Sequence, residues 1–186
     1  MAQEFSYNIA YTAAANKGAA PEERLSRSEL WQGIKRGGRH PGDFGTFVLS
    51  CKVVSGDKNR FVREMMIGEG AVHTKDGTKM LQDVVIQEPI YVAATTQDTG
   101  AVSTLVVAGD AQAEPGQEDD NPVLTLFYEL KMGDHAPAPD SPEAEAIRTN
   151  YSALARNMVT DCITHIRKWK LEGKLAQWAE DNKKDI

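Results

Sequence analysis

The beginning of the chain changes from the hydrophobic pattern of a strand to that of a helix. Apolar residues alternate with polar or small ones over residues 5–11, which is the period of two that a half-buried strand shows. Ser26 and Glu29 then have the spacing of a capping box, in which each side chain satisfies a free backbone N–H group. We therefore predict a helix from this point to the glycine and proline residues of segment 37–42.

The middle of the chain, from residue 46 to residue 132, has an almost continuous strand pattern. Short alternating runs are separated by turn residues such as glycine, proline and aspartate, as expected for strands joined by tight connections. The predicted strands cover residues 47–53, 61–67, 71–75, 80–87, 90–96, 102–107 and 123–132. The acidic segment 108–121 is rich in glycine, proline and alanine, which predicts an exposed loop.

The longest helical pattern begins at Ser141, Pro142 and Glu143. A serine cap, a proline at the first helical position and an acid in the first turn all favour a helix start. Six apolar residues then recur every three or four positions and predict one buried stripe: Ile147, Tyr151, Leu154, Met158, Cys162 and Ile166. We predict a single domain over residues 1–176 and a flexible C-terminal tail over 177–186.

The order of these elements predicts an α+β fold. Hairpin-length connections favour a curved antiparallel sheet of about seven strands, wrapped around a long C-terminal helix, with one or two short helices after the first strand. A single amphipathic helix cannot fill all the space beneath such a sheet, so a ligand cavity is expected between them. The alternative is a two-layer sandwich whose core is filled with side chains.

The composition limits the function classes that fit the chain. The chain has 186 residues, is 41% hydrophobic and carries a net charge of −6, which argues against a general nucleic-acid binder. No apolar run approaches the length of a membrane span, and no secretory signal is visible at residues 1–5. Cys51 and Cys162 are too few for a zinc site or a disulfide framework. We expect a cytoplasmic protein without metal or cofactor, and the oligomeric state is left open.

Several segments of the chain resemble the AtaL-like family, named after acetylaranotin biosynthesis cluster protein L. The similarity is carried by residues 25–33, 50–53, 61–64, 124–126, 141–144 and 164–167. It extends over about residues 10–168 and implies the START-like helix-grip fold of the birch-pollen-allergen-like superfamily (SRPBCC), whose AtaL-like members are mostly fungal or bacterial. It also implies a cavity for an apolar or amphipathic small molecule. Segments 36–43, rich in glycine, and 108–121, unusually long, depart from the family pattern.

Two groups of residues are candidates for acid–base chemistry. His73 lies in the predicted strand 71–75, where it is either a general base at the cavity or a solvent-facing side chain. Asp161 and His165 are four residues apart on the long helix, so their side chains are neighbours. They form either a carboxylate–imidazole dyad or an ordinary surface ion pair.

Arg63 and Glu64 are adjacent on one predicted strand and therefore point to opposite faces of the sheet. Only one of them can face the cavity, and apolar neighbours on both sides leave the choice open. An ionisable residue that faces an apolar cavity is a strong candidate for a mechanistic role, and it must be paired or hydrogen-bonded. A structural pair across the strands is the alternative.

Aromatic residues and one methionine are candidates for ligand contact. Trp31, Tyr91, Tyr128 and Tyr151 offer flat apolar surfaces and polar hydrogen-bond donors, and Met158 belongs to the helical stripe. Core packing is the alternative for each of them.

The sequence favours three functions. The first is a cofactor-independent enzyme of secondary metabolism that cyclises, isomerises or dehydrates a polyketide- or peptide-derived intermediate, mainly by positioning it. The second is a non-catalytic carrier with the same cavity. The third is an interaction module with a filled interior. No phosphate-binding glycine motif, zinc motif, nucleophile elbow or dinucleotide fingerprint occurs in the sequence.

Overall fold

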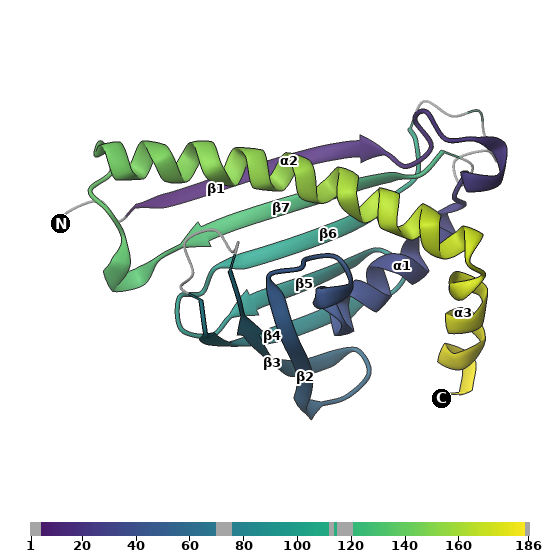
Figure 1. Ribbon diagram of the computed structural model, residues 1–186, viewed down its shortest axis with the longest axis horizontal. Helices are drawn as coiled ribbons and strands as arrows, with labels where there is room; N and C mark the ends of the chain where they lie inside the picture. The colour runs from purple at the N-terminus through teal and green to yellow at the C-terminus, as the bar shows by residue number, and fades with distance from the viewer. Residues whose placement is uncertain (1–4, 70–75, 112–113, 115–120, 185–186) are drawn as a thin grey trace.

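The computed structural model describes residues 5–69, 76–111, 114 and 121–184. Within these residues, seven strands form one antiparallel sheet in the order β1-β7-β6-β5-β4-β3-β2 (Figure 1). The strands are β1 (Ser6–Ala14), β2 (Val48–Gly56), β3 (Arg60–Ile67), β4 (Thr78–Gln87), β5 (Tyr91–Thr96), β6 (Val102–Ala108) and β7 (Val123–Lys131). Strands β2 to β7 thus pair with their neighbours in sequence, and β1 closes the order beside β7. The predicted strand 71–75 lies outside the described residues.

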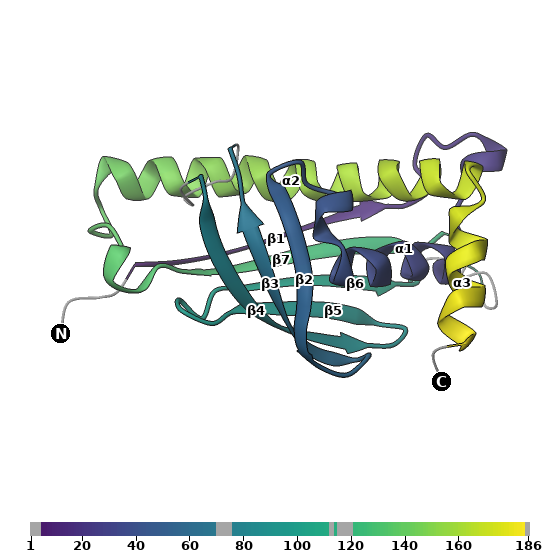
Figure 2. The same ribbon diagram turned by 60° about the horizontal axis from the view of Figure 1, so that its bottom comes forward.

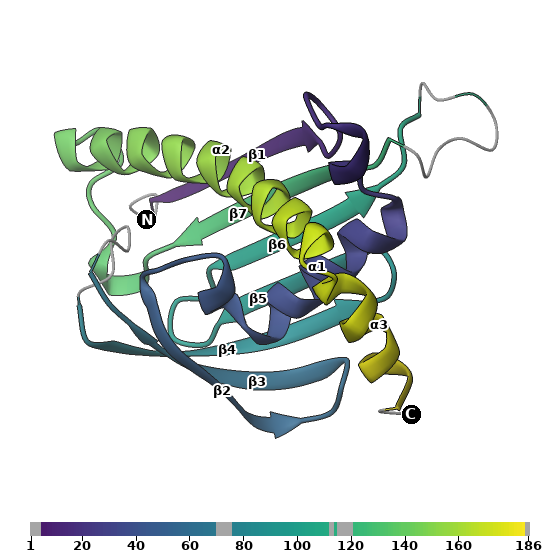
Figure 3. The ribbon, with the colours of Figure 1, turned by 45° about the vertical axis from the view of Figure 1, so that its right-hand side comes forward.

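A long helix, α2 (Pro142–Leu171), crosses the sheet and packs chiefly on β1 and β7. Strands β2 to β4 rise on one side of α2, so the sheet curves around the helix (Figure 2). The shorter helix α1 (Arg27–Arg39) lies between the C-terminal half of α2 and the sheet (Figure 3). Three 3-10 turns complete the connections: η1 (Pro21–Glu23), η2 (Pro41–Asp43) and η3 (Gly133–His135). This is the helix-grip arrangement that the sequence predicts.

Helices α1 and α2 both begin at the residues that the sequence indicates. The Ser26 hydroxyl accepts a hydrogen bond from the Glu29 backbone N–H at 3.2 Å, and the Glu29 carboxylate accepts one from the Ser26 N–H at 2.8 Å. Ser141 caps α2 by accepting a hydrogen bond from the Ala144 N–H at 3.1 Å. These caps satisfy N–H groups that have no partner within the helix.

The end of α1 differs from the prediction, because the helix continues through Gly37 and Gly38 to Arg39. A Cβ atom on Gly37 would lie 2.0 Å from the Phe44 ring, and one on Gly38 would lie 3.0 Å from Val92. The two glycines therefore allow the helix to approach its neighbours closely. Here close tertiary packing outweighs the low helix propensity of glycine.

The C-terminal segment also differs from the prediction of a flexible tail over 177–186. The structure has a further helix, α3 (Lys174–Lys184). Leu175 is buried, and the Trp178 ring packs edge-on against Trp169 of α2 with 5.2 Å between centroids. On α1, the Arg36 guanidinium lies 5.0 Å from the centre of the Trp178 ring. Aromatic packing therefore attaches α3 to both α1 and α2.

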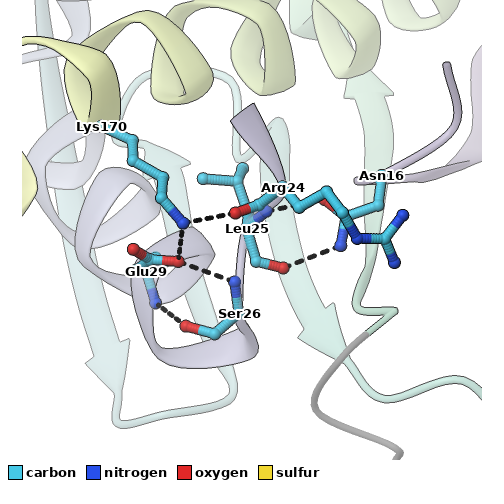
Figure 4. A network of polar contacts seen from close by, with 6 residues as sticks. All are labelled: Asn16, Arg24, Leu25, Ser26, Glu29 and Lys170. Carbon is cyan, nitrogen blue, oxygen red and sulfur yellow. Dashed lines mark hydrogen bonds and ion pairs between the residues drawn. The ribbon is translucent and has the colours of Figure 1, made fainter. Parts of the chain in front are cut away.

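Polar contacts connect the start of α1 to the end of α2 (Figure 4). The Lys170 ammonium donates to the Glu29 carboxylate at 2.9 Å and to the Arg24 backbone carbonyl. Next to them, the Asn16 amide donates to the Leu25 carbonyl at 2.9 Å and accepts from the Leu25 N–H at 2.7 Å. These contacts hold the connection between β1 and α1 against the last turns of α2.

The buried apolar residues form two clusters along α2. The larger cluster joins α1, the C-terminal half of α2 and the inner face of the sheet, with Leu30, Ile34, Leu124 and Ile166 fully buried in it. The smaller cluster lies at the N-terminal end of α2 and contains Phe5, Leu130, Ala144 and Ile147. The two clusters hold the helix at both ends and leave the functional site between them.

Candidate functional site

A cavity of about 240 Å³ lies between the sheet, the end of α1 and the middle of α2. Most of the side chains around it are apolar. They include Met65, Ile67, Val92, Leu105, Leu126 and Leu154. The prediction of a hollow interior is therefore confirmed, and the alternative of a fully filled sandwich is wrong. The volume lies somewhat below the range of about 300–1,000 Å³ that is usual for ligand pockets, so the cavity can enclose a small molecule or one end of a larger one.

The buried stripe of α2 changes character where it passes the cavity. Ile147 and Ile166 near its ends are 1% and 0% exposed, whereas Tyr151, Leu154 and Met158 between them are half-buried. These three residues line the cavity, so part of their accessible surface borders empty space. The same helical periodicity thus supplies packed contacts at both ends and a cavity wall in the middle.

Arg63 is the ionisable residue of the Arg63–Glu64 pair that faces inward. Along β3, Arg63 shares the buried face with Phe61, Met65 and Ile67, and it is itself only 6% exposed. It lines the cavity. The strand alternation therefore resolves the choice that the sequence left open, because Glu64 has to point outward.

The Arg63 guanidinium is held by a polar network on the cavity wall. Its Nη1 donates to the Gly38 carbonyl at 2.6 Å, and its Nε and Nη2 donate to the Gln82 side-chain oxygen at 3.0 and 2.7 Å. The Gln82 amide in turn donates to the Thr96 hydroxyl at 3.1 Å. Gly38 lies in the last turn of α1, where carbonyl groups lack partners within the helix and carry partial negative charge.

Burial lowers the pKa of Arg63 to about 10. The guanidinium therefore remains charged at neutral pH despite its apolar surroundings. Cys51 lies near this charge, yet burial raises the pKa of its thiol, which stays neutral. Arg63 is thus the cation of the cavity wall, and the cysteine beside it supplies no counter-charge.

Glu64 lies on the outer face and binds two lysines of the neighbouring strands. Its carboxylate is 3.0 Å from Lys52 Nζ and 2.5 Å from Lys79 Nζ. Hydrogen bonds from Lys79 and Lys52 hold the pKa of this carboxyl below its usual value. This is the cross-strand structural pairing considered as the alternative role.

Tyr128 and Tyr151 line the cavity together, with their rings edge to face and 5.8 Å between centroids. Burial raises the pKa of both hydroxyl groups. Cys162 also borders the cavity, and burial raises the pKa of its thiol to about 12. At neutral pH all three groups are protonated, so they can donate hydrogen bonds but cannot act as bases or as an anionic nucleophile.

The structure does not form the predicted dyad of Asp161 and His165. His165 Nδ1 lies 2.8 Å from the backbone carbonyl oxygen of Asp161, and the Asp161 residue is exposed. In a helix, side chains lean toward the preceding turn, where the imidazole meets a carbonyl. The His165 ring packs near Phe44 and Trp169 and is not among the residues around the cavity.

Two further candidates, Trp31 and Tyr91, do not line the described cavity. Trp31 is 3% exposed within the larger apolar cluster. Tyr91 begins β5, where Val92 and Ala94 occupy the buried positions, so the alternation turns Tyr91 away from them. His73 lies outside the described residues. Of the predicted contact residues, Tyr128, Tyr151 and Met158 do line the cavity.

Sequence reasoning did not identify Gln82, Thr96 and Gly38 as parts of the site. Gln82 shares the inner face of β4 with Val84 and Ile86, and a polar residue on an otherwise apolar face is a recognisable signal. Thr96 has the same position on β5 relative to Val92 and Ala94. No comparable signal marks Gly38, because its contribution is a backbone carbonyl.

Two further features bear on the class of site. Within the described ranges, no three His, Cys, Asp or Glu side chains gather in a way that could hold a metal ion. None of the helices in the described part of the chain combines the length and apolar character that crossing a bilayer requires.

Comparison with known proteins identifies the family. The acetylaranotin biosynthesis cluster protein L family matches residues 9–173. The chain belongs to this family. Its relative of that name from Aspergillus terreus is 31% identical over 176 residues, which cover 92% of this chain and 94% of the relative. The crystal structure of Ara h 8.0201 matches with a TM-score of 0.53 at 11% identity, over 90% of this chain and 99% of that one. That similarity supports the helix-grip fold of the AtaL family.

Proposed function

We propose that the protein binds a hydrophobic small molecule in its cavity and acts on it as a cofactor-independent enzyme of secondary metabolism. The name of the Aspergillus terreus relative, which refers to a biosynthesis cluster, supports the metabolic setting. The proposal includes a cytoplasmic location. The observation that supports the proposed binding and catalysis is an apolar cavity with a buried cation, Arg63, on its wall.

The geometry supports catalysis by positioning and by electrostatic stabilisation. Apolar walls from α2 and the sheet would hold a flexible intermediate in a folded shape, which lowers the entropic part of a barrier. The fixed Arg63 guanidinium would stabilise negative charge that develops on a carbonyl oxygen during cyclisation, isomerisation or dehydration. Tyr128 lines the same cavity and can add a hydrogen bond to such an oxygen. The substrate would be a polyketide- or peptide-derived intermediate.

A non-catalytic carrier is the second candidate, and one observation favours it. Among the described residues around the cavity, Glu129 is the one with a carboxylate. It is exposed and alternates along β7 with the inward Tyr128 and Leu130, so its side chain lies on the outer face. The described lining therefore offers no inward carboxylate or imidazole that could serve as a general base.

The binding part of the proposal is tested by filling the cavity. Leu154→Trp places a large side chain in the space, whereas Ala153→Trp places the same side chain on the exposed face of the same helix. The proteins are incubated with an extract of fungal secondary metabolites and analysed by native mass spectrometry. We expect a retained small molecule in the wild type and in Ala153→Trp but not in Leu154→Trp. If the wild type retains no molecule, the proposed function is wrong.

The retained molecule then separates enzyme from carrier. It is supplied to the wild type and to Arg63→Ala, and its conversion is followed by liquid chromatography and mass spectrometry. If the protein is an enzyme, the wild type converts the molecule faster than it reacts in buffer alone, and Arg63→Ala loses most of this acceleration. Release of unchanged molecule at the same rate by both proteins supports the carrier instead.

A further inference from the structure

Arg63 is a buried cation whose partners among the described residues are all neutral. Its hydrogen bonds go to a backbone carbonyl and to an amide oxygen, and no carboxylate of the described residues forms an ion pair with it. A buried charge is unfavourable unless opposite charge compensates it. The carbonyl end of α1 supplies only about half an elementary negative charge. The part of the cavity wall that the structure describes therefore keeps a net positive charge.

The guanidinium also has unused hydrogen-bond donors. Arginine carries five N–H groups, and the contacts with Gly38 and Gln82 use the Nε–H and one N–H on each of Nη1 and Nη2. One N–H on each terminal nitrogen is left without an acceptor among the described residues. N–H groups of this kind are the donors that arginine offers to the oxygens of a carboxylate.

The neighbouring side chains fix the guanidinium without neutralising it. Gln82 is itself held by the Thr96 hydroxyl, and that hydroxyl has the Met80 sulfur at 3.9 Å as a weak acceptor. Amide, hydroxyl and thioether are uncharged, so this network orients Arg63 and leaves its charge available. A cation that is fixed in advance at an apolar wall is suited to an anionic group on an otherwise apolar molecule.

We propose that the ligand of the cavity is an organic anion, with a carboxylate or a delocalised enolate held by Arg63 and an apolar remainder against Leu154 and Met158. This inference rests on the proposed function, because it assumes that the cavity binds a hydrophobic small molecule. It adds the sign of the ligand's charge and the end of the ligand that contacts Arg63. Neutral molecules of the same shape would leave the guanidinium without compensation.

The test compares 2-naphthoate with 2-naphthamide, which have nearly the same shape and differ in charge at neutral pH. Each is titrated into the wild-type protein by isothermal titration calorimetry at pH 7. We expect the acid to bind at least about tenfold more tightly, which corresponds to one charge-assisted hydrogen bond. Equal affinities would overturn the inference while leaving the proposed binding function intact. Binding of neither probe would contradict the proposed function and the inference together.

Variants of β3 assign the preference to Arg63. Arg63→Met keeps an apolar stem and removes the charge, so the preference for the acid should disappear. Glu64→Gln is the matched control, since it removes a charge from the adjacent residue on the outer face, and it should keep the preference. Arg63→Lys retains a cation and should keep part of the preference, which covers the case in which the methionine variant does not fold. A preference that persists in folded Arg63→Met would overturn the role of Arg63.

Discussion

The ends and the middle of α2 differ in what their inward residues contact. At the C-terminal end, Ile166 is fully buried against α1, and its side chain lies where a Cβ on Gly33 would be. In the middle, Leu154 and Met158 of the same stripe border a cavity. One periodic pattern therefore serves two purposes. The packed ends stabilise the fold, and the middle borders the cavity in which we propose that a ligand binds.

The largest expected difference between the two regions is in the cost of removing a side chain. Ile166→Ala should lower the free energy of unfolding by about 2–5 kcal/mol, because it opens a new void in a packed cluster. Leu154→Ala should cost less than half as much, because its side chain already borders empty space. Urea unfolding followed by circular dichroism measures both. Equal losses would contradict the distinction between packed and open regions.

The second prediction concerns the close approach of α1 to α2. A Cβ on Gly33 would lie 2.4 Å from Ile166 Cγ1, so Gly33→Ala should lower the free energy of unfolding by about 1–3 kcal/mol. In the double variant with Ile166→Ala, the Cγ and Cδ atoms that this Cβ would meet are removed, so the clash is relieved. The two losses should then sum to more than the loss in the double variant. Strictly additive losses would show that the two residues do not press on each other.

The third prediction concerns the pH dependence of the contact between Glu29 and Lys170. Burial alone would raise the pKa of Glu29, but hydrogen bonds from Ser26 and Lys170 outweigh it and hold the pKa below the usual 4.5. The carboxylate therefore stabilises the fold above about pH 4.5, and this contribution is lost as the pH falls through the lowered pKa. Glu29→Gln should cost about 0.5–1 kcal/mol at pH 7, since the group is half-exposed.

The measurement compares the unfolding free energies of wild type and Glu29→Gln at pH 7 and at pH 3. The difference should shrink at the lower pH, where a larger fraction of the glutamate is protonated. A difference that does not change with pH would show that the charge of Glu29 has no role in this contact.

The smallest effect is expected at the outer face of β3. Glu64 lies between two exposed lysines, and ion pairs of this kind contribute little because water and salt screen them. Glu64→Gln should therefore leave the urea midpoint close to that of the wild type, with any shift reduced further in 0.5 M sodium chloride. A large loss of stability would show that the outer face of β3 matters more than its exposure indicates.

Local patterns predicted most of the fold. Strand alternation, the capping residues Ser26 and Ser141 and the stripe of α2 depend on neighbours in the sequence, and the structure confirms them. The course of α1 through Gly37 and the helix that contains Trp178 were not predicted. Both depend on packing between separate elements, which the local pattern does not show. Gly37 packs against Phe44 beyond the end of α1, and Trp178 packs against Trp169 of α2 and Arg36 of α1.

The site was predicted less completely than the fold. Alternation restricted the choice to Arg63 or Glu64, but which face of β3 is inward depends on the tertiary arrangement of the sheet. Helical spacing correctly made Asp161 and His165 neighbours, yet it could not show that the imidazole would meet a backbone carbonyl. The Gly38 carbonyl leaves no trace in the identity of a side chain.

The seating of α2 on β1 and β7 has a consequence for divergence within the family. Strands β3 to β5 contribute Met65, Gln82 and Val92 to the cavity. The helix packs chiefly on β1 and β7, which lie toward the other edge of the sheet. Substitutions on those three strands can change the shape of the cavity without disturbing how the helix is supported. If the cavity binds a small molecule as we propose, single substitutions on these strands can alter its specificity while the architecture stays the same.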